Sequence, residues 1–176
     1  MNRHVLPWAA ALLLAIVPAC GENPKVAEKE GNAQAEQANL ANFDDLDFNV
    51  FSGQKWDSLG RSHAADIKVH WPDGRVTDGL ETHVEDLKSM FVFAPDTRIQ
   101  EHPIRIASGE WTAVTGIMEG TFTQPMPGPN GTTIAPTGKS FRLPMATIGR
   151  WRDGVMVEEH LFWDNQAFLK QIGAMP

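Results

Sequence analysis

The stretch Lys139–Trp163, which reads KSFRLPMATIGRWRDGVMVEEHLFW, contains the strongest fold signal in the chain. Strand-like runs precede and follow the dipeptide Asp153-Gly154, which is typical of a two-residue β-hairpin turn. We therefore predict two long antiparallel strands, over 139–152 and 155–163. Pro144 lies inside the first run and indicates a bulge or an edge position, because proline cannot donate to a strand ladder.

A second hairpin is predicted upstream, with strands over 99–107 and 111–123. The segment 124–138 between the two hairpins is rich in proline and glycine, so we expect a long surface loop there. After the last strand, Asp164 fits the N-cap of a short C-terminal helix that ends at Gly173.

The part of the chain before these hairpins has helical periodicity instead. Apolar residues recur at three- and four-residue spacing over 40–50, and a second short helix is expected to extend to His63. A strand follows over 67–71, and Asp78 then fits the N-cap of a helix whose apolar stripe covers 80–91. Helices followed by antiparallel strands indicate an α+β fold, with N-terminal helices packed on a strongly curved sheet that forms a conical cavity.

Composition narrows the classes of function. The chain has 176 residues and carries 15 Lys and Arg against 22 Asp and Glu, for a net charge of −7. That balance argues against a nucleic-acid partner, since no excess of cations is available to neutralise phosphates. A single cysteine excludes both an intramolecular disulfide and a thiolate zinc site.

The first twenty residues have the pattern of a bacterial export signal that ends in a lipidated cysteine. A cationic start precedes an apolar run over 5–18, which is shorter than the roughly 20 residues that span a bilayer. The run ends in Val17-Pro18-Ala19-Cys20, which resembles a lipobox. An ordinary secretory signal with an incidental cysteine is the alternative.

We expect three regions along the chain. Residues 1–19 form a lipoprotein signal peptide, residues 20–39 contain the lipidated Cys20 and a flexible tether, and residues 40–176 form the folded domain. The tether prediction depends on its polar composition, which offers too little apolar surface to offset the entropy of ordering. The expected location is the periplasm or cell envelope, with the lipid anchor as the only contact with the membrane.

Several short motifs follow one another in a characteristic order over residues 43–173. They include His70-Trp71-Pro72, Phe93-Ala94-Pro95-Asp96, Pro136-Thr137-Gly138-Lys139, Arg152-Asp153-Gly154 and Trp163-Asp164-Asn165. In this order the motifs resemble the SnoaL-like polyketide cyclase and ester cyclase family of the nuclear transport factor two-like superfamily. The resemblance implies a cystatin-like α+β barrel and acid–base chemistry without metal or cofactor in a dry pocket.

The resemblance also locates a catalytic position. The catalytic aspartate of that family falls on Leu161 in this chain, so another side chain would have to act as the base. Strand alternation places Glu159, Leu161 and Trp163 on one face. Glu159 is therefore the first candidate for the base, and a solvated strand carboxylate is the alternative interpretation.

Three histidines are further candidates for acid–base catalysis. His70 could instead bond to backbone at a strand end, His83 could be a satisfied core residue, and His160 is expected on the outer face of the sheet. None has the spacing of a metal-binding motif, so we expect no metal. The pocket wall is expected to contain large apolar side chains, namely Trp71, Met90, Phe91, Trp111, Leu161 and Trp163.

Two functions remain open at this point. The first is cofactor-free acid–base catalysis of the cyclase, isomerase or hydrolase type on a small hydrophobic carbonyl compound. The second is a non-catalytic domain that binds a hydrophobic ligand or a protein partner at the cell envelope. The expected partner is a small hydrophobic molecule in either case, and homodimerisation is left open.

Overall fold

The computed structural model describes residues 24–175. Its helices and strands follow one another in this order: α1 (Pro24–Asp45), a π-helical turn (Leu46–Phe51), a 3₁₀ helix (Trp56–Arg61), β1 (His63–His70), β2 (Val76–Asp78), α2 (Leu80–Phe93), β3 (Arg98–Ile99), β4 (Arg105–Ser108), β5 (Trp111–Thr121), β6 (Met126–Pro127), a second 3₁₀ turn (Pro129–Gly131), β7 (Thr133–Ile134), β8 (Ser140–Arg152), β9 (Val155–Trp163) and α3 (Asn165–Gln171). The fold is therefore α+β, as the sequence predicts.

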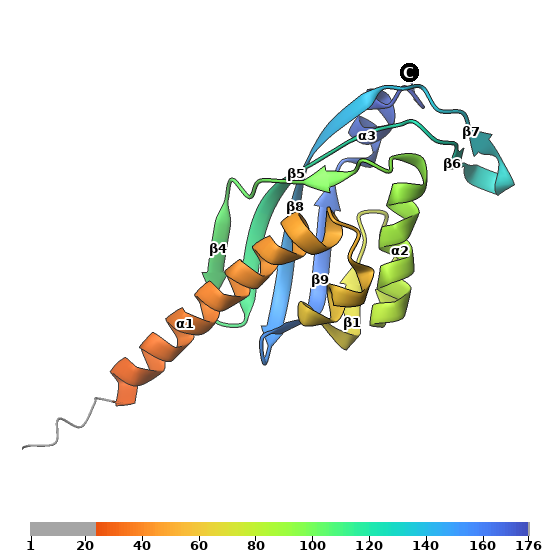
Figure 1. Ribbon diagram of the computed structural model, residues 1–176. Coiled ribbons are helices and arrows are strands. Elements are labelled where there is room, and N and C mark those ends of the chain that lie inside the picture. The colour runs from red at the N-terminus through yellow and green to blue at the C-terminus, as the bar shows by residue number, and fades with distance from the viewer. Residues whose placement is uncertain (1–23, 176) are drawn as a thin grey trace, which may run out of the picture.

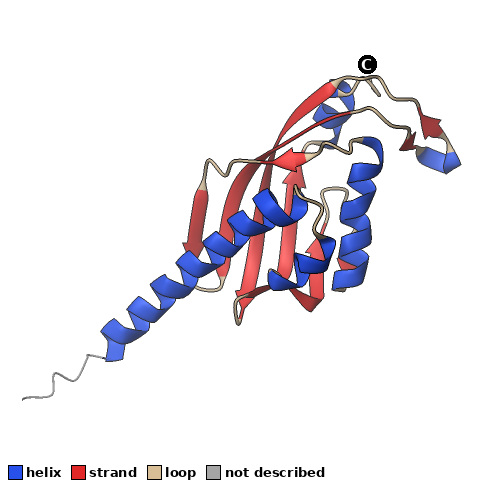
Figure 2. Ribbon diagram, viewed as in Figure 1, coloured by secondary structure: helices blue, strands red, loops and turns tan. Residues whose placement is uncertain are grey.

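One seven-stranded sheet forms the body of the domain, in the order β2-β1-β9-β8-β5-β3, with β4 also paired to β5. All its pairs are antiparallel except β1 with β9, which is parallel. Helices α1 and α2 cover one face of this sheet (Figures 1 and 2). The expected fold, helices packed on a curved and mostly antiparallel sheet, is confirmed; the sheet is open, with β2 and β3 at its ends, and does not close into a barrel.

The β8–β9 hairpin confirms the prediction from Asp153-Gly154. Both residues have left-handed backbone angles, φ 51° and φ 80°, which is the combination that a type I′ turn requires. A bulge between Arg150 and Trp151 shifts the register of this hairpin, so that Glu159 pairs with Gly149 and Leu161 with Thr147. Glu159 and Leu161 are both buried, at 4% and 7% exposure, so this hairpin directs them to the covered face of the sheet.

Four local predictions differ from the structure. The strand expected over 99–107 is divided into β3 and β4, with Pro103 between them, because proline interrupts the ladder. The expected loop 124–138 contains the short β6–β7 hairpin. His63 begins β1 instead of ending a helix. Asp78 belongs to β2, where its carboxylate meets the Lys68 ammonium, and Gly79 takes the N-cap position of α2.

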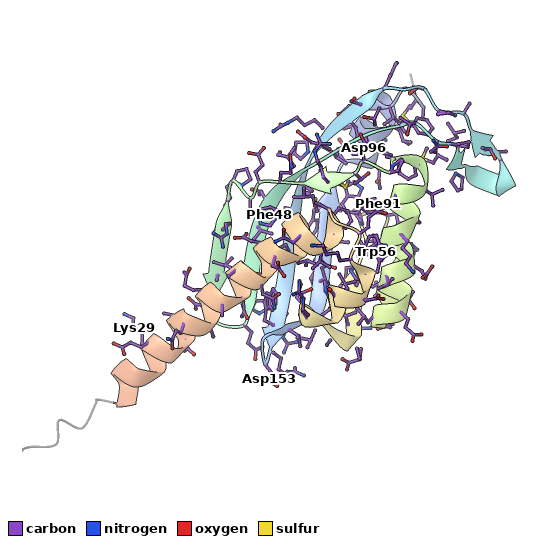
Figure 3. The ribbon with its side chains drawn as sticks, viewed as in Figure 1. Lys29, Phe48, Trp56, Phe91, Asp96 and Asp153 are labelled. Carbon is purple, nitrogen blue, oxygen red and sulfur yellow. The ribbon has the colours of Figure 1, made fainter. Side chains whose placement is uncertain are left out.

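Helix α1 crosses the boundary that we predicted between tether and domain. Its described side chains over 29–35 are exposed, as the polar sequence implies, and Lys29 lies on the free end of the helix (Figure 3). From Glu36 onward the helix contacts the domain: the Glu36 carboxylate accepts a 2.7 Å hydrogen bond from the backbone N–H of Gly109. The segment 24–39 is thus helical, and Cys20 and residues 1–19 lie outside the described residues.

The core lies between the sheet and the helices. The predicted apolar residues of the first helix are buried, with Phe43 at 1% exposure against the ring of Trp151. Trp151 is itself 2% exposed and donates an indole hydrogen bond of 2.8 Å to Thr112 Oγ1. Burying side chains of this size contributes about 1.5–3 kcal/mol each. None of the described helices is both long and apolar enough to span a membrane.

Candidate functional site

A small cavity opens between the covered face of the sheet and the helices. Its volume is about 40 Å³, which is room for a few water molecules. Most of its wall is apolar, and five polar or titratable side chains reach it: Asp47, His63, His83, Thr147 and Glu159. The lining consists of Leu46, Asp47, Phe51, His63, Trp71, His83, Leu87, Met90, Ile99, Met118, Met145, Thr147, Glu159, Leu161 and Trp163.

Glu159 is the buried carboxylate of this cavity. Its Oε2 atom lies 3.3 Å from His83 Nε2 and 3.8 Å from His63 Nε2, yet this buried oxygen has no hydrogen-bond partner among the described residues. Burial by itself raises the pKa of Glu159, but the neighbouring imidazoles in their protonated form, His63 first, outweigh burial and hold this pKa below its ordinary value of 4.5. The carboxylate is therefore ionised near neutral pH, as a general base must be.

The tautomer of His63 follows from its neighbour Ser62. The Ser62 hydroxyl donates its only proton to the carbonyl of Leu59, at 3.0 Å, and lies 2.9 Å from His63 Nδ1. Nδ1 must then be the donor to Ser62, and the neutral ring has its lone pair on Nε2. That atom is buried, unpartnered among the described residues and close to the carboxylate of Glu159. His63 can therefore receive a proton from the cavity.

His83 enters the cavity from α2 and stays neutral. It is 2% exposed, and burial lowers its pKa to about 4 in spite of the nearby Glu159 carboxylate. Its ring lies 5.0 Å from that of His63 and 5.8 Å from that of Trp71, measured between centroids. Its Nε2 faces the Glu159 carboxylate at 3.3 Å without forming a hydrogen bond to it.

A second polar group approaches the cavity through the π-helical turn that follows α1. Asp47 accepts a 2.8 Å hydrogen bond from His102 Nε2, and the other ring nitrogen of His102 lies 2.8 Å from Asp44, which also pairs with Arg105. Burial raises the pKa of Asp47, although the neighbouring imidazole of His102 opposes the effect. π-Helical turns are frequent at functional sites, and this one directs Asp47 toward the same cavity as Glu159.

The structure brings together most of the residues that the sequence singled out. Glu159 and His83 line the cavity, and so do four expected wall residues, Trp71, Met90, Leu161 and Trp163. Phe91 is corrected: it packs in the core against the rings of Phe51 and Trp56, with centroids 5.1 and 5.3 Å away, and is not among the residues that line the cavity. The reason is its position on the side of α2 that faces the first helices. Figure 3 labels Phe91 and Trp56.

Three other candidates lie on the opposite face of the sheet. Strand alternation from the buried Val69 and Glu159 directs His70 and His160 outward, where their rings stack with centroids 4.1 Å apart. His160 was expected there, whereas the cavity position expected for His70 is corrected. Trp111 is corrected as well: it is 42% exposed, and its ring lies 6.4 Å from that of His160.

Sequence reasoning missed His63, Asp47 and His102 as parts of the site. Helical periodicity placed His63 on a helix face, and the parallel pairing of β1 with β9 that carries it to Glu159 has no local signature. Asp47 lies next to the apolar stripe that was recognised, but a π-helical turn re-aims it. The positions of Glu159 and His160 on opposite faces of the sheet were expected.

Comparison with known proteins supports the same fold. The profile of the SnoaL-like polyketide cyclase family matches residues 44–172. Similar solved structures include a SnoaL-like protein from Jannaschia sp., with 19% identity, a TM-score of 0.69, and coverage of 81% of this chain and 96% of that one. IdmH from Streptomyces antibioticus has 24% identity and a TM-score of 0.66, covering 77% and 98%. A SnoaL-like polyketide cyclase from Agrobacterium tumefaciens has 18% identity and a TM-score of 0.56, covering 71% and 91%.

The comparison with curated proteins gave no significant match. The matched profile covers well over half of the chain and includes every residue of the cavity that contains Glu159, from Leu46 to Trp163. The overall fold agrees with that of the structural neighbours. The chain therefore belongs to the SnoaL-like polyketide cyclase family.

Proposed function

We propose that the cavity performs cofactor-free acid–base chemistry, of the cyclase, isomerase or hydrolase type, on a small hydrophobic carbonyl compound. One observation carries this proposal. Glu159 holds a carboxylate oxygen without a hydrogen-bond partner among the described residues, inside a mostly apolar cavity and within 4 Å of two imidazole nitrogens. A site that leaves such an oxygen unpartnered is suited to a ligand with an acidic proton.

The proposed step is removal of a proton alpha to the carbonyl. Glu159 Oε2 accepts the proton, and the electron pair of the broken C–H bond moves to the carbonyl oxygen as an enolate. The proton on Glu159 can return to another carbon, or pass to Nε2 of His63, which lies 3.8 Å away.

The wall of the cavity supports a small, apolar substrate. A volume of about 40 Å³ admits only a small occupant in this conformation. Met90, Met118 and Met145 supply unbranched thioether side chains, which can change rotamer to admit a larger molecule. The indole N–H groups of Trp71 and Trp163 already donate to Thr77 and Asn165. These tryptophans therefore shape the wall and exclude water.

A non-catalytic binding domain is the second candidate. It is supported by Leu161, which is buried in the cavity wall at the position where the family resemblance implies an aspartate. In that case the same cavity would hold a hydrophobic ligand, and Glu159 would only accept a hydrogen bond from it.

Binding and conversion by matched variants distinguish the two functions. Small hydrophobic carbonyl compounds are screened for binding by ligand-observed NMR, and each binder is followed for chemical change. Catalysis predicts that Glu159→Gln keeps affinity and lowers turnover by about a hundredfold or more. Leu161→Asp is the complementary variant, and it can restore proton transfer with a raised carboxyl pKa. A binder that wild-type protein never converts favours the binding domain.

We further propose that the protein is exported and held at the cell envelope by lipid on Cys20. The support is the cationic start and apolar run that end in Val17-Pro18-Ala19-Cys20. Expression in bacteria with a radiolabelled fatty acid should label the wild-type protein and leave Cys20→Ser unlabelled and unattached to membranes. Unlabelled wild-type protein in the soluble fraction would contradict the lipid anchor.

A further inference from the structure

A cluster of metal-ligating side chains lies on the outer face of the sheet, on the other side from the cavity. It consists of His70 at the end of β1, and Glu158 and His160 on β9. The parallel register of these strands sets His70 directly beside His160, and strand alternation puts Glu158 on the same face. The proposed acid–base chemistry does not use these three residues.

Their ligand atoms converge on one carboxylate oxygen. Nε2 of His70 and Nε2 of His160 each lie 3.2 Å from Oε1 of Glu158. All three ligand atoms lie within 4.8 Å of one another. In a tetrahedral site with metal–ligand distances of about 2.0–2.1 Å, neighbouring ligand atoms are separated by about 3.3–3.4 Å. Both nitrogen–oxygen separations are therefore close to the edge of such a tetrahedron.

The surroundings leave this oxygen available to an ion. Arg150 approaches the other oxygen of Glu158, with Nη1 3.8 Å from Oε2. Lys68, which pairs with Glu158 in the strand register, is engaged by Asp78. The three ligand side chains are about one-quarter to one-third exposed, so an ion can reach them from solvent.

We propose that His70, Glu158 and His160 bind a divalent transition-metal ion such as Zn²⁺ on the outer face of the sheet. Two imidazoles and one carboxylate suit Zn²⁺, Cu²⁺ and Co²⁺, and the fourth position remains for water. The two rings are nearly parallel, at 6°, so binding tilts them until their Nε2 lone pairs meet at the ion. The ion would tie β1 to β9 across their parallel pair.

The test uses the full chain without a polyhistidine tag, freed of metal by a chelator. Calorimetric titration with Zn²⁺ should show one saturable site, and Co²⁺ should give the visible absorption of a low-coordinate complex. His70→Gln and His160→Gln should each weaken Zn²⁺ binding by about tenfold or more. Glu158→Gln should also weaken Zn²⁺ binding by about tenfold or more. This third variant keeps the proposal testable if a histidine variant fails to fold.

A matched control separates this cluster from the cavity, where His63, His83 and Glu159 also lie within 4.8 Å. His83→Gln should leave the affinity for Zn²⁺ unchanged. A loss of binding in His83→Gln, with binding retained in His70→Gln, would move the ion into the cavity and overturn the proposal. Absence of saturable binding at about 1 mM Zn²⁺ would overturn it as well.

The fluorescence of Trp111 can report whether the metal ion binds at the outer face of the sheet. Its ring centroid lies 6.4 Å from that of His160, so Cu²⁺ bound at the outer face should quench its fluorescence. Trp111→Phe should remove most of the quenched component. Equal quenching in wild type and Trp111→Phe would place the ion away from this face and contradict the proposal.

Discussion

Replacing His102 by leucine tests whether Asp44, Asp47 and His102, beside the cavity, form one buried hydrogen-bonded network that stabilises the fold. The imidazole is nearly inaccessible, with 1% of its side chain exposed, and it contacts two carboxylates at 2.8 Å. Leucine keeps apolar contact with the neighbouring rings of Phe43 and Phe48 but removes both hydrogen bonds. Asp47, with 12% of its side chain exposed, is then left without its imidazole partner.

The expected cost is about 3 kcal/mol of the free energy of unfolding. Breaking a buried ion pair by removing one partner costs about 3–5 kcal/mol, because the remaining charge stays buried without compensation. We take the lower end, since Asp44 is 28% exposed and keeps its ion pair with Arg105. A loss of this size is large against the roughly 5–15 kcal/mol that stabilises an ordinary domain.

The pH dependence has a defined sign. Burial lowers the pKa of His102, but the carboxylates of Asp47 and Asp44 outweigh it, and the net pKa is raised above 6.5. The stabilisation is therefore complete below pH 6.5 and is lost as pH rises through the raised pKa. The stability difference between wild type and His102→Leu should be largest near pH 6 and smaller in alkali.

Urea denaturation followed by tryptophan fluorescence measures both effects. The double variant His102→Leu, Asp47→Asn should recover part of the loss, because the uncompensated charge is gone. Two results would refute this network. One is a His102→Leu variant whose free energy of unfolding lies within about 0.5 kcal/mol of wild type at pH 6. The other is a double variant in which the costs of the two single substitutions simply add.

Three further substitutions test how the fold holds the site. Asp164→Ala removes an N-cap that accepts two backbone hydrogen bonds in α3, so urea denaturation should show a loss of about 1 kcal/mol, and an unchanged midpoint would contradict the cap. Gly154→Val forces a β-branched residue to φ 80°, and should lower the melting temperature more than Gly154→Asn does; equal effects would argue against the type I′ turn. Trp151→Phe deletes the indole bond to Thr112 and leaves a void, for an expected loss of about 1–3 kcal/mol in the same denaturation assay; a neutral result would contradict the packing.

The elements with a local signature were predictable from sequence. Asp153-Gly154 predicts the last hairpin, and strand alternation predicts that Glu159 and Leu161 share a face. Asp164 caps α3 as predicted, because an N-cap bonds to its own next residues. Alternation also separated Glu159 from His160, which are adjacent in sequence and lie on opposite faces of the sheet.

The parts that depend on pairing over long distances were not predictable. His63 and His70 reach Glu159 and His160 only because β1 runs parallel to β9, and nothing in either segment specifies that partner. The helix over 24–39 lacks an apolar face, so its sequence alone favoured an irregular tether. Asp47 is turned toward the cavity by a π-helical turn, which a regular helical period does not predict.

Exchange of alpha protons for deuterium tests most directly whether Glu159 acts as a base in the cavity. Small cyclic ketones in D₂O are followed by proton NMR with wild-type protein, with Glu159→Gln and with buffer alone. The assay needs no knowledge of the natural product, because it detects the first proton transfer. Since the pKa of Glu159 lies below 4.5, the catalysed rate should be independent of this group between pH 6 and 8.

The proposed chemistry predicts that wild-type protein accelerates exchange for at least one ketone that binds in the cavity. Glu159→Gln should bind that ketone equally well and exchange it about a hundredfold more slowly or worse. Equal exchange rates for wild type and Glu159→Gln, with the ketone bound to both, would contradict the role of Glu159 as the base.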